Sequence, residues 1–222
     1  MITPRLKSIL DIVETKTIAD IGTDHAYIPI RLAEEGRITK AIACDKNEGP
    51  IKIAKENIKR YNFEKIIDTR CGDGLKPLVK NEVETIIIAG MGGKLIGNII
   101  EDGLDIAKES ELILQPMNAQ YELRKRLEQL NFEIVAEYLS KEGFKVYNLL
   151  KVRYNKNLKR KNLPEIEYHI PKSLLTNELC PMLIAKKKRE FEKILQGQKN
   201  SDNSDKKLIE YLETMLSEIS KL

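Results

Sequence analysis

Residues Thr17–Pro29 carry the sequence TIADIGTDHAYIP, and this stretch decides the fold. Its first half is a short apolar run, which predicts a buried strand. The run is followed by Asp20, Gly22 and Asp24, so the strand is expected to open into a tight turn. Glycine permits backbone dihedrals that other residues avoid and lets the chain approach a ligand closely. We therefore expect a ligand site at this turn, with the rest of the chain folded beside it.

Apolar runs alternate with helical patterns downstream of this turn and predict a doubly wound α/β fold. This fold implies a mostly parallel sheet of about seven strands with helices on both faces. Its ligand is expected outside the carboxyl ends of the strands. The last two runs, on either side of Gly143, are expected to pair antiparallel. Strands are predicted at Thr17–Gly22, Ala41–Asp45, Ile66–Cys71, Thr85–Ala89, Glu111–Leu114, Phe132–Leu139 and Phe144–Tyr154. Helices are predicted at Pro4–Val13, Ile28–Glu35 and Glu122–Leu130. Two more are predicted, one that begins at Pro50 and one that follows Gly93 and ends at Ile100.

A second, helical domain is predicted after the sheet, with domains at residues 1–165 and 166–222. Two helices, Leu179–Leu195 and Lys206–Leu222, flank the polar turn Gly197–Asp205. In the second helix the apolar residues step by four and three positions, which is typical of a coiled-coil seam. We therefore expect an antiparallel helical hairpin. The seam consists of Leu208, Leu212, Met215, Ile219 and Leu222.

Composition limits the class of protein. The chain has 222 residues, a formal net charge of +4 and three cysteines without a CxxC pair. Reduced thiols are expected, with no disulfide framework and no zinc site, and two histidines are too few for a histidine-based metal centre. No stretch is long and apolar enough to span a bilayer. We expect a cytoplasmic protein without metal or membrane, as a monomer or a weak homodimer.

The turn after the first strand suits a cation better than a diphosphate. A dinucleotide site would carry GxGxxG, whereas this turn has one glycine and acids that would repel a diphosphate. S-adenosylmethionine carries a sulfonium and an ammonium group, and we take it as the expected cofactor. Asp24 has an alternative role as the cap of the next helix.

Two further acidic turns follow the next two strands. Asp45 lies 23 residues beyond Gly22, a spacing at which an acid binds ribose hydroxyls. Asp73, between two glycines, is a candidate for the adenine, and the glycine-rich turn Gly90–Gly93 leaves room for two ligands. The predicted cofactor residues are Asp20, Gly22, Thr23, Asp24, Asp45, Lys46, Gly72, Asp73, Gly74, Ala89, Gly90, Met91 and Gly92.

Four motifs together resemble the bacterial tRNA (adenine-22-N1)-methyltransferase family. The resemblance implies a class I, Rossmann-like methyltransferase domain with a C-terminal helical hairpin, and transfer of a methyl group from S-adenosylmethionine to N1 of an adenine in the D-arm of tRNA. One departure is Met117, which separates Gln-Pro from Asn where family members often have Gln-Pro-Asn. The motifs are DIGTDHAYIP at Asp20–Pro29, CGDGL at Cys71–Leu75, IIAGMGG at Ile87–Gly93 and LILQP at Leu112–Pro116.

The resemblance also implies roles on the substrate side. Tyr27 is the candidate for stacking on the adenine, and Asp24 and His25 for shaping the pocket or contacting the exocyclic amine. Tyr27 is alternatively a core aromatic residue, and His25 a polar residue that bonds the backbone at a helix start. The predicted catalytic residues are Asp24, His25, Tyr27, Gln115 and Pro116.

Basic residues are the candidates for RNA binding, since phosphate contacts dominate affinity for RNA. Gly143–Pro164 carries seven Lys or Arg and no acid, although a solvated surface explains such a run as well. The helical hairpin is predicted to lie along the tRNA, or alternatively to dimerise. The candidates are Arg5, Lys7, Lys151, Arg153, Lys156, Lys159, Arg160, Lys161, Lys186, Lys187, Lys188 and Arg189.

Three other functions stay open at this point. One is a methyltransferase of the same fold that acts on a protein or a small molecule. Another is a non-catalytic RNA-binding or scaffold protein, which the acids Asp20, Asp24, Asp45 and Asp73 disfavour. The third, a nicotinamide-dependent oxidoreductase, is disfavoured by the missing GxGxxG.

Overall fold

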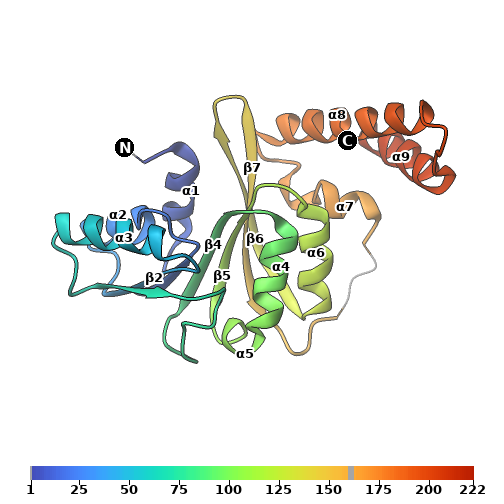
Figure 1. The fold of residues 1–222 in the computed structure, drawn as a ribbon. Helices are drawn as coiled ribbons and strands as arrows, with labels where there is room; N and C mark the ends of the chain where they lie inside the picture. Colours follow the sequence, from blue (N-terminus) through green and yellow to red (C-terminus); the bar gives the residue numbers. More distant parts are fainter. Residues whose placement is uncertain (1, 160–162) are drawn as a thin grey trace. The chain divides into compact units, whose positions relative to one another are not determined.

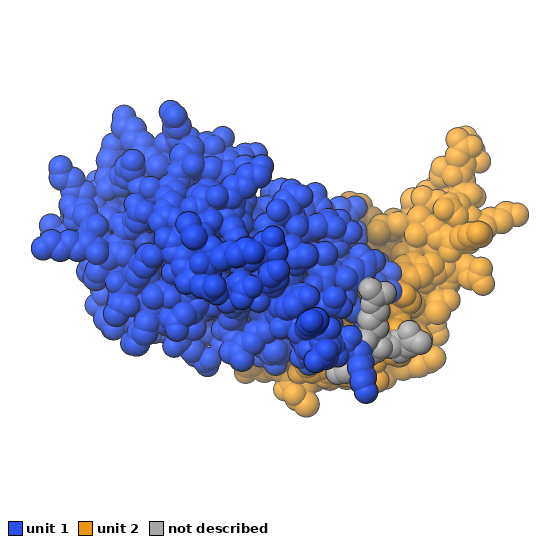
Figure 2. Space-filling model, turned by 90° about the horizontal axis from the view of Figure 1, so that it is seen from below, with its two compact units in different colours: residues 1–160 blue, residues 161–222 orange. Residues whose placement is uncertain are grey.

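The structure is a computed structural model that describes residues 2–159 and 163–222. It consists of two compact units, residues 1–160 and 161–222 (Figure 2). The unit boundary lies five residues before the predicted domain boundary, and the division of roles between the two domains stays a prediction. Within the described residues, no helix has the length and apolar character needed to cross a membrane.

The first unit is built on a seven-stranded sheet in the order β3-β2-β1-β4-β5-β7-β6 (Figure 1). The first five strands in this order run parallel, and β7 pairs antiparallel with both β5 and β6. This sheet confirms the predicted fold. The strands are β1 (Thr17–Ile21), β2 (Lys40–Asp45), β3 (Ile67–Cys71), β4 (Thr85–Met91), β5 (Glu111–Pro116), β6 (Phe132–Glu142) and β7 (Lys145–Tyr154).

Helices cover both faces of the sheet. The middle of β4 shows why: Ile87 packs toward one face, and Ile86 and Ile88 toward the other, all fully buried. Such strands must be covered on both sides. The first three helices cover the Ile87 face, and the next three cover the other. The helices are α1 (Pro4–Ile12), α2 (Tyr27–Glu34), α3 (Glu48–Arg60), α4 (Gly93–Asp102), α5 (Leu104–Ala107) and α6 (Gln120–Gln129).

The strand order reverses beside β1, because β2 and β4 flank it on opposite sides. In an open parallel sheet, ligands bind in the crevice outside the carboxyl ends of the strands at such a reversal. The turn after β1 lies there, next to the end of β4. The fold therefore places the two glycine-bearing turns, at Gly22 and Gly90, at one edge of the sheet.

The second unit contains the predicted helical hairpin, formed by α8 (Cys180–Lys199) and α9 (Lys206–Ile219). Three of the five predicted seam residues are buried, whereas Leu222 is half exposed. Helix α8 continues into the predicted polar turn, and Asp205 caps α9 by accepting from the backbone N–H groups of residues 207 and 208. Two short elements were not predicted, α7 (Glu165–His169) and the 3-10 turn η1 (Lys172–Leu174).

Candidate functional site

A cavity of about 380 Å³ opens at the carboxyl edge of the sheet, between β1 and β4. Its size lies in the range of small-molecule pockets. Most of its lining comes from the turn after β1, with α1 on one side and the end of β4 on the other. The lining residues are Arg5, Leu6, Asp20, Gly22, Thr23, Asp24, His25, Ala26, Tyr27, Ile28, Ala89 and Gly90.

The turn after β1 is held by its own backbone. The N–H groups of Gly22 and Thr23 both donate to the carbonyl of Cys44, at 2.8 and 2.9 Å. The hydroxyl of Thr23 accepts from the N–H of Ala26 at 3.2 Å, and Ala26 takes a left-handed φ of 56° just before α2. No side chain caps α2, so the alternative role of Asp24 as a helix cap is wrong.

The backbone conformation at this turn favours Gly22. Its φ of +77° is a conformation that residues with a Cβ rarely adopt. A Cβ at this position would also lie 2.0 Å from Cε of Met91, but this atom is the end of a flexible side chain that can move, so the positive φ is the stronger reason. Gly90 likewise has a φ of +78°, beside the irregularity in the pairing of β4 with β5. Both turns therefore bring bare backbone to the pocket.

Asp20 is the buried acid of the pocket. It is 6% exposed, and burial raises the pKa of its carboxyl to about 6, although a hydrogen bond with Thr23 lowers it. In the described part of the chain no Lys, Arg or His pairs with this carboxylate. A ligand that carries positive charge would supply the missing counter-charge, so the pocket fits S-adenosylmethionine better than a phosphate-bearing cofactor.

The other acidic turns lie at the same edge of the sheet but do not line the cavity. Asp45 Oδ1 accepts from the backbone N–H and the side-chain amide of Asn47, at 2.8 and 3.2 Å. Asp73 is exposed and lies 3.5 Å from Lys76. Their contacts with a cofactor stay predictions, as do those of the remaining predicted residues outside the cavity, Lys46, Gly72, Gly74, Met91 and Gly92.

On the open side of the pocket, three residues form one chain of contacts. The carboxylate of Asp24 lies 3.1 Å from Nε2 of His25, and the His25 ring stacks on Tyr27 with centroids 4.9 Å apart and planes at 18°. Tyr27 is 50% exposed, so its alternative role as a core aromatic residue is wrong. Asn57 donates to the carbonyl of His25 at 3.1 Å and fixes its backbone. An aromatic face is thus presented at the mouth of the pocket.

Gln115 and Pro116 lie at the end of β5. Both are buried and neither lines the cavity, and their predicted contact with a substrate stays a prediction. Oε1 of Gln115 accepts from the guanidinium of Arg5 at 2.6 Å and from the backbone N–H of Gly90 at 3.2 Å. Gln115 therefore holds two lining residues in place and is a positioning residue.

Two of the residues predicted to bind RNA, Lys151 and Arg153, are engaged in ion pairs. Lys151 is 6% exposed and pairs with Glu14 at 2.6 Å and Glu111 at 3.2 Å, so its ammonium is not available to a phosphate. Arg153 pairs with Glu111 at 2.6 Å, but its side chain is 63% exposed, so its predicted RNA contact stays a prediction. Because Glu111 begins β5, both basic residues lie at the edge of the sheet opposite the pocket.

The remaining basic candidates differ in exposure. Lys187 is buried and pairs with Glu190 at 2.9 Å, and Lys7 pairs with Asp11 at 3.2 Å on the outside of α1. Lys156, Lys159, Lys188 and Arg189 are exposed, and Lys186 is half-buried. Arg160 and Lys161 lie outside the described residues.

The sequence did not predict the residues that hold the pocket lining in place. These are Ala26, Asn57 and the contacts of Arg5 with Glu142 and Tyr147. Arg5 lies 3.6 Å from Glu142 and stands over the ring of Tyr147, both on the β6–β7 hairpin. These contacts join residues more than one hundred positions apart, and no local pattern encodes them. Among the described residues there is no cluster of His, Cys, Asp or Glu that could hold a metal ion.

The sheet order and the cation-suited pocket define a methyltransferase of the Rossmann-like class. Residues 2–150 match the family model of the methyltransferase domain. A tRNA (adenine(22)-N(1))-methyltransferase of Bacillus subtilis is 34% identical over 148 residues, which cover 66% of this chain and 62% of the Bacillus protein. The match thus spans less than two thirds of that relative.

Solved structures extend the similarity to the full chain. The crystal structure of a candidate tRNA (m1A22) methyltransferase of Streptococcus pneumoniae matches with a TM-score of 0.87 and 32% identity, over 100% of this chain and 99% of its own. The same Streptococcus protein in complex with S-adenosyl-L-methionine matches with a TM-score of 0.84. The chain belongs to the methyltransferase-domain family and, within it, to the family of bacterial tRNA (adenine-22-N1)-methyltransferases.

Proposed function

We propose that this protein transfers the methyl group of S-adenosylmethionine to N1 of an adenine in the D-arm of tRNA, at position 22. The observation that carries the proposal is the presence, in one pocket, of a half-exposed aromatic pair and of a buried acid that has no counter-cation among the described residues. Asp20 suits a cationic cofactor, and Tyr27 stacked on His25 suits a planar base. The names of the Bacillus and Streptococcus relatives support the choice of tRNA.

The cofactor side is formed by the turn after β1 and the end of β4. Asp20 would supply negative charge toward the cationic end of the cofactor. The bare backbone at Gly22 and Gly90 allows close approach, and we propose that Asp45 accepts from the ribose hydroxyls. When bound, S-adenosylmethionine supplies a methyl group on a positively charged sulfur: the adenine N1 lone pair forms the N–C bond as the C–S bond breaks, and that bond's electron pair goes to sulfur.

The substrate side needs no strong base, because adenine N1 carries a free lone pair at neutral pH. The residues of the pocket contribute by positioning the base and by stabilising the positive charge that develops on its ring. Tyr27 would stack on the adenine, and the exposed carboxylate of Asp24 would face the developing cation. N1 lies on the pairing edge of the base, so the adenine must be unpaired when it enters the pocket.

The decisive experiment incubates the protein with labelled S-adenosylmethionine and total bacterial tRNA and then maps the modified nucleoside. The expected product is N1-methyladenosine in the D-arm. Label in a different nucleoside, or in protein instead of RNA, would refute this assignment and favour a methyltransferase of the same fold with another substrate. Absence of cofactor binding in calorimetry would refute both readings and leave a non-catalytic RNA-binding protein.

A tRNA substrate supports a cytoplasmic location for this protein.

The helical hairpin of the second unit would contact tRNA through exposed Lys188 and Arg189, and the alternative is a dimer interface. Light scattering tests the expected monomer or weak homodimer, and Lys188→Ala with Arg189→Ala should weaken tRNA binding without changing the oligomeric state.

A further inference from the structure

The β6–β7 hairpin ends in a phenylalanine that no described part of the chain covers. Phe144 is 100% exposed. The other three phenylalanines, Phe63, Phe132 and Phe191, are packed into apolar surroundings or against another ring. Single exposed apolar residues are common on protein surfaces, so the case for a role of Phe144 depends on its position in the fold and on its neighbours.

The hairpin tip is a tight turn. Glu142 and Lys145 are paired in register, so the turn has only two residues between its strands. Gly143 has a φ of +58°, as the first central residue of a type II′ turn requires, and Phe144 is the second. The ring is therefore presented by a short, regular turn rather than by a long loop.

The tip lies at the pocket edge of the sheet. Because β7 runs antiparallel to β5, with Leu114 opposite Leu150, Pro116 at the end of β5 is level with residue 148. Phe144 is four residues beyond that level, about 13 Å further along the strand direction. In Figure 1 the hairpin extends past the ends of the neighbouring strands.

Contacts with α1 fix the hairpin relative to the pocket. The hydroxyl of Ser8 donates to that of Ser140 at 2.8 Å. Arg5, which lines the pocket, lies 3.6 Å from Glu142 and stands over Tyr147, 5.9 Å from its ring centroid. Pocket and hairpin therefore share one side chain, and the tip has a set position beside the mouth of the pocket.

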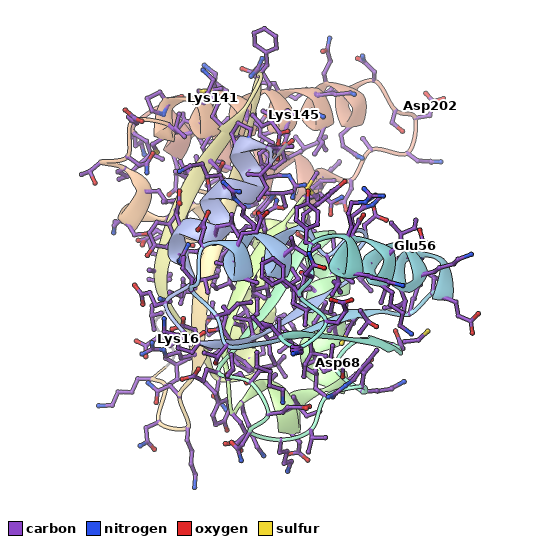
Figure 3. All side chains as sticks on the ribbon, turned by 90° about the vertical axis from the view of Figure 1, so that its left-hand side faces the viewer. Lys16, Glu56, Asp68, Lys141, Lys145 and Asp202 are labelled. Carbon is purple, nitrogen blue, oxygen red and sulfur yellow. The ribbon has the colours of Figure 1, made fainter. Side chains whose placement is uncertain are left out.

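The charges at the tip favour an anionic partner. Lys141 and Lys145 are exposed on the two strands that lead into the turn, where Figure 3 labels them at the opposite end of the sheet from Lys16. Neither lysine has a carboxylate partner among the described residues, and the nearby acid Glu142 is already paired with Arg5. An aromatic ring between two unpaired ammonium groups is a combination that binds bases and phosphates together.

We propose that this hairpin tip, residues 141–145, is an RNA-binding element: Phe144 stacks on an unpaired base of the tRNA, and Lys141 and Lys145 bind the flanking phosphates. The inference rests on the proposed tRNA substrate. Since the target adenine must leave its stack to enter the pocket, a fixed aromatic ring beside the pocket mouth can stabilise the opened RNA.

A tryptophan placed at the tip tests the stacking directly, because the chain contains no tryptophan. Phe144→Trp should keep methylation activity, and its fluorescence should be quenched when tRNA binds. The matched control is Val79→Trp in the β3–β4 loop, a 66% exposed position whose neighbour Glu82 pairs with Lys40 at the other end of the sheet. Its fluorescence should not change. Unquenched Phe144→Trp in a sample where tRNA is bound would overturn the proposal.

Two substitutions without an aromatic ring test how much the Phe144 ring contributes to tRNA binding. Phe144→Ala and Phe144→Leu should both weaken tRNA binding about tenfold, with unchanged affinity for S-adenosylmethionine, because neither offers a ring for stacking. Wild-type tRNA affinity in both variants would overturn the proposal. It would also be overturned if the wild-type protein self-associates and Phe144→Ala abolishes this association, because the ring would then be a contact between two copies of the chain. If wild-type protein binds tRNA but forms no N1-methyladenosine, the proposed function fails, and the quenching result still decides the role of the tip.

Discussion

Arg5 and Gln115, one on the first helix and the other at the end of β5, are joined by a hydrogen bond of 2.6 Å from the guanidinium to Oε1. The same oxygen accepts from the backbone N–H of Gly90. Gln115 is fully buried, so this one atom sets the position of two residues that line the pocket. Gln115 therefore holds the pocket lining in place from a position outside the cavity.

Gln115→Ala should weaken both the pocket and the fold. The change removes the part-buried acceptor that the Arg5 guanidinium and the Gly90 N–H share, which costs about 1 kcal/mol in the free energy of unfolding. It also releases Arg5, so kcat should fall more than the affinity for S-adenosylmethionine. Gln115→Glu keeps the acceptor and is the control. Denaturant unfolding and calorimetry measure the two effects; wild-type stability and kcat in Gln115→Ala would contradict the positioning role.

Asp20 should make cofactor binding and stability respond to pH in opposite directions. Burial raises its pKa to about 6 in the folded protein, above the ordinary value of 3.8. Its contribution to stability is therefore present below pH 4 and is lost as pH rises through 6, up to about 3 kcal/mol. The affinity for a cationic cofactor should instead rise over the same range, since the carboxylate is the binding form.

Asp20→Asn separates these two effects. The ligand-free variant should lose the wild type's decline in stability between pH 4 and 7, and at pH 8 it should be more stable than the wild type. It should bind S-adenosylmethionine weakly, with no dependence on pH near 6. Thermal unfolding across pH and calorimetry at pH 5 and 8 provide the measurements. A cofactor affinity in Asp20→Asn equal to that of the wild type would remove Asp20 from the site.

The sequence predicted the sheet and the turn after β1 because both depend on local patterns. β-branched runs such as Ile86–Ile88 form strands that are buried on both faces, and a lone glycine between acids marks a turn. It could not predict that Gln115 lies beneath the pocket or that Lys151 is buried between carboxylates. Those positions depend on which strands become neighbours, and the antiparallel β7 brings residues 145 and 154 to opposite edges of the sheet.

Lys151→Ala should destabilise the protein without affecting RNA binding. Its ammonium neutralises Glu111, which is 7% exposed, and removal of one partner leaves a buried carboxylate less well paired. Arg153 still pairs with Glu111, so we expect a loss of up to about 3 kcal/mol in the free energy of unfolding. Exposed Lys156→Ala is the control, with no change in stability. If the folded Lys151→Ala variant binds tRNA more weakly than the wild type, Lys151 is an RNA contact after all.

Tyr27→Ala should slow methyl transfer while leaving the affinity for the cofactor unchanged. The ring is half exposed at the pocket mouth and lies against His25, so its removal takes away the face on which the adenine would stack. Stacking of a base on an aromatic side chain contributes about 1–3 kcal/mol, which corresponds to a loss of roughly tenfold or more in kcat/KM for tRNA. Tyr27→Phe keeps the ring and should retain most of the activity.

Tyr61→Ala provides the matched control for Tyr27. Tyr61 is 47% exposed, close to the 50% of Tyr27, but it follows the last residue of α3 and lies toward the opposite edge of the sheet. Single-turnover methylation of tRNA at saturating cofactor compares the two alanine variants under the same conditions. If both retain the wild-type rate, Tyr27 does not touch the base; if both lose it equally, the effect is on folding rather than on stacking. Only a loss confined to Tyr27→Ala supports a base held against that ring.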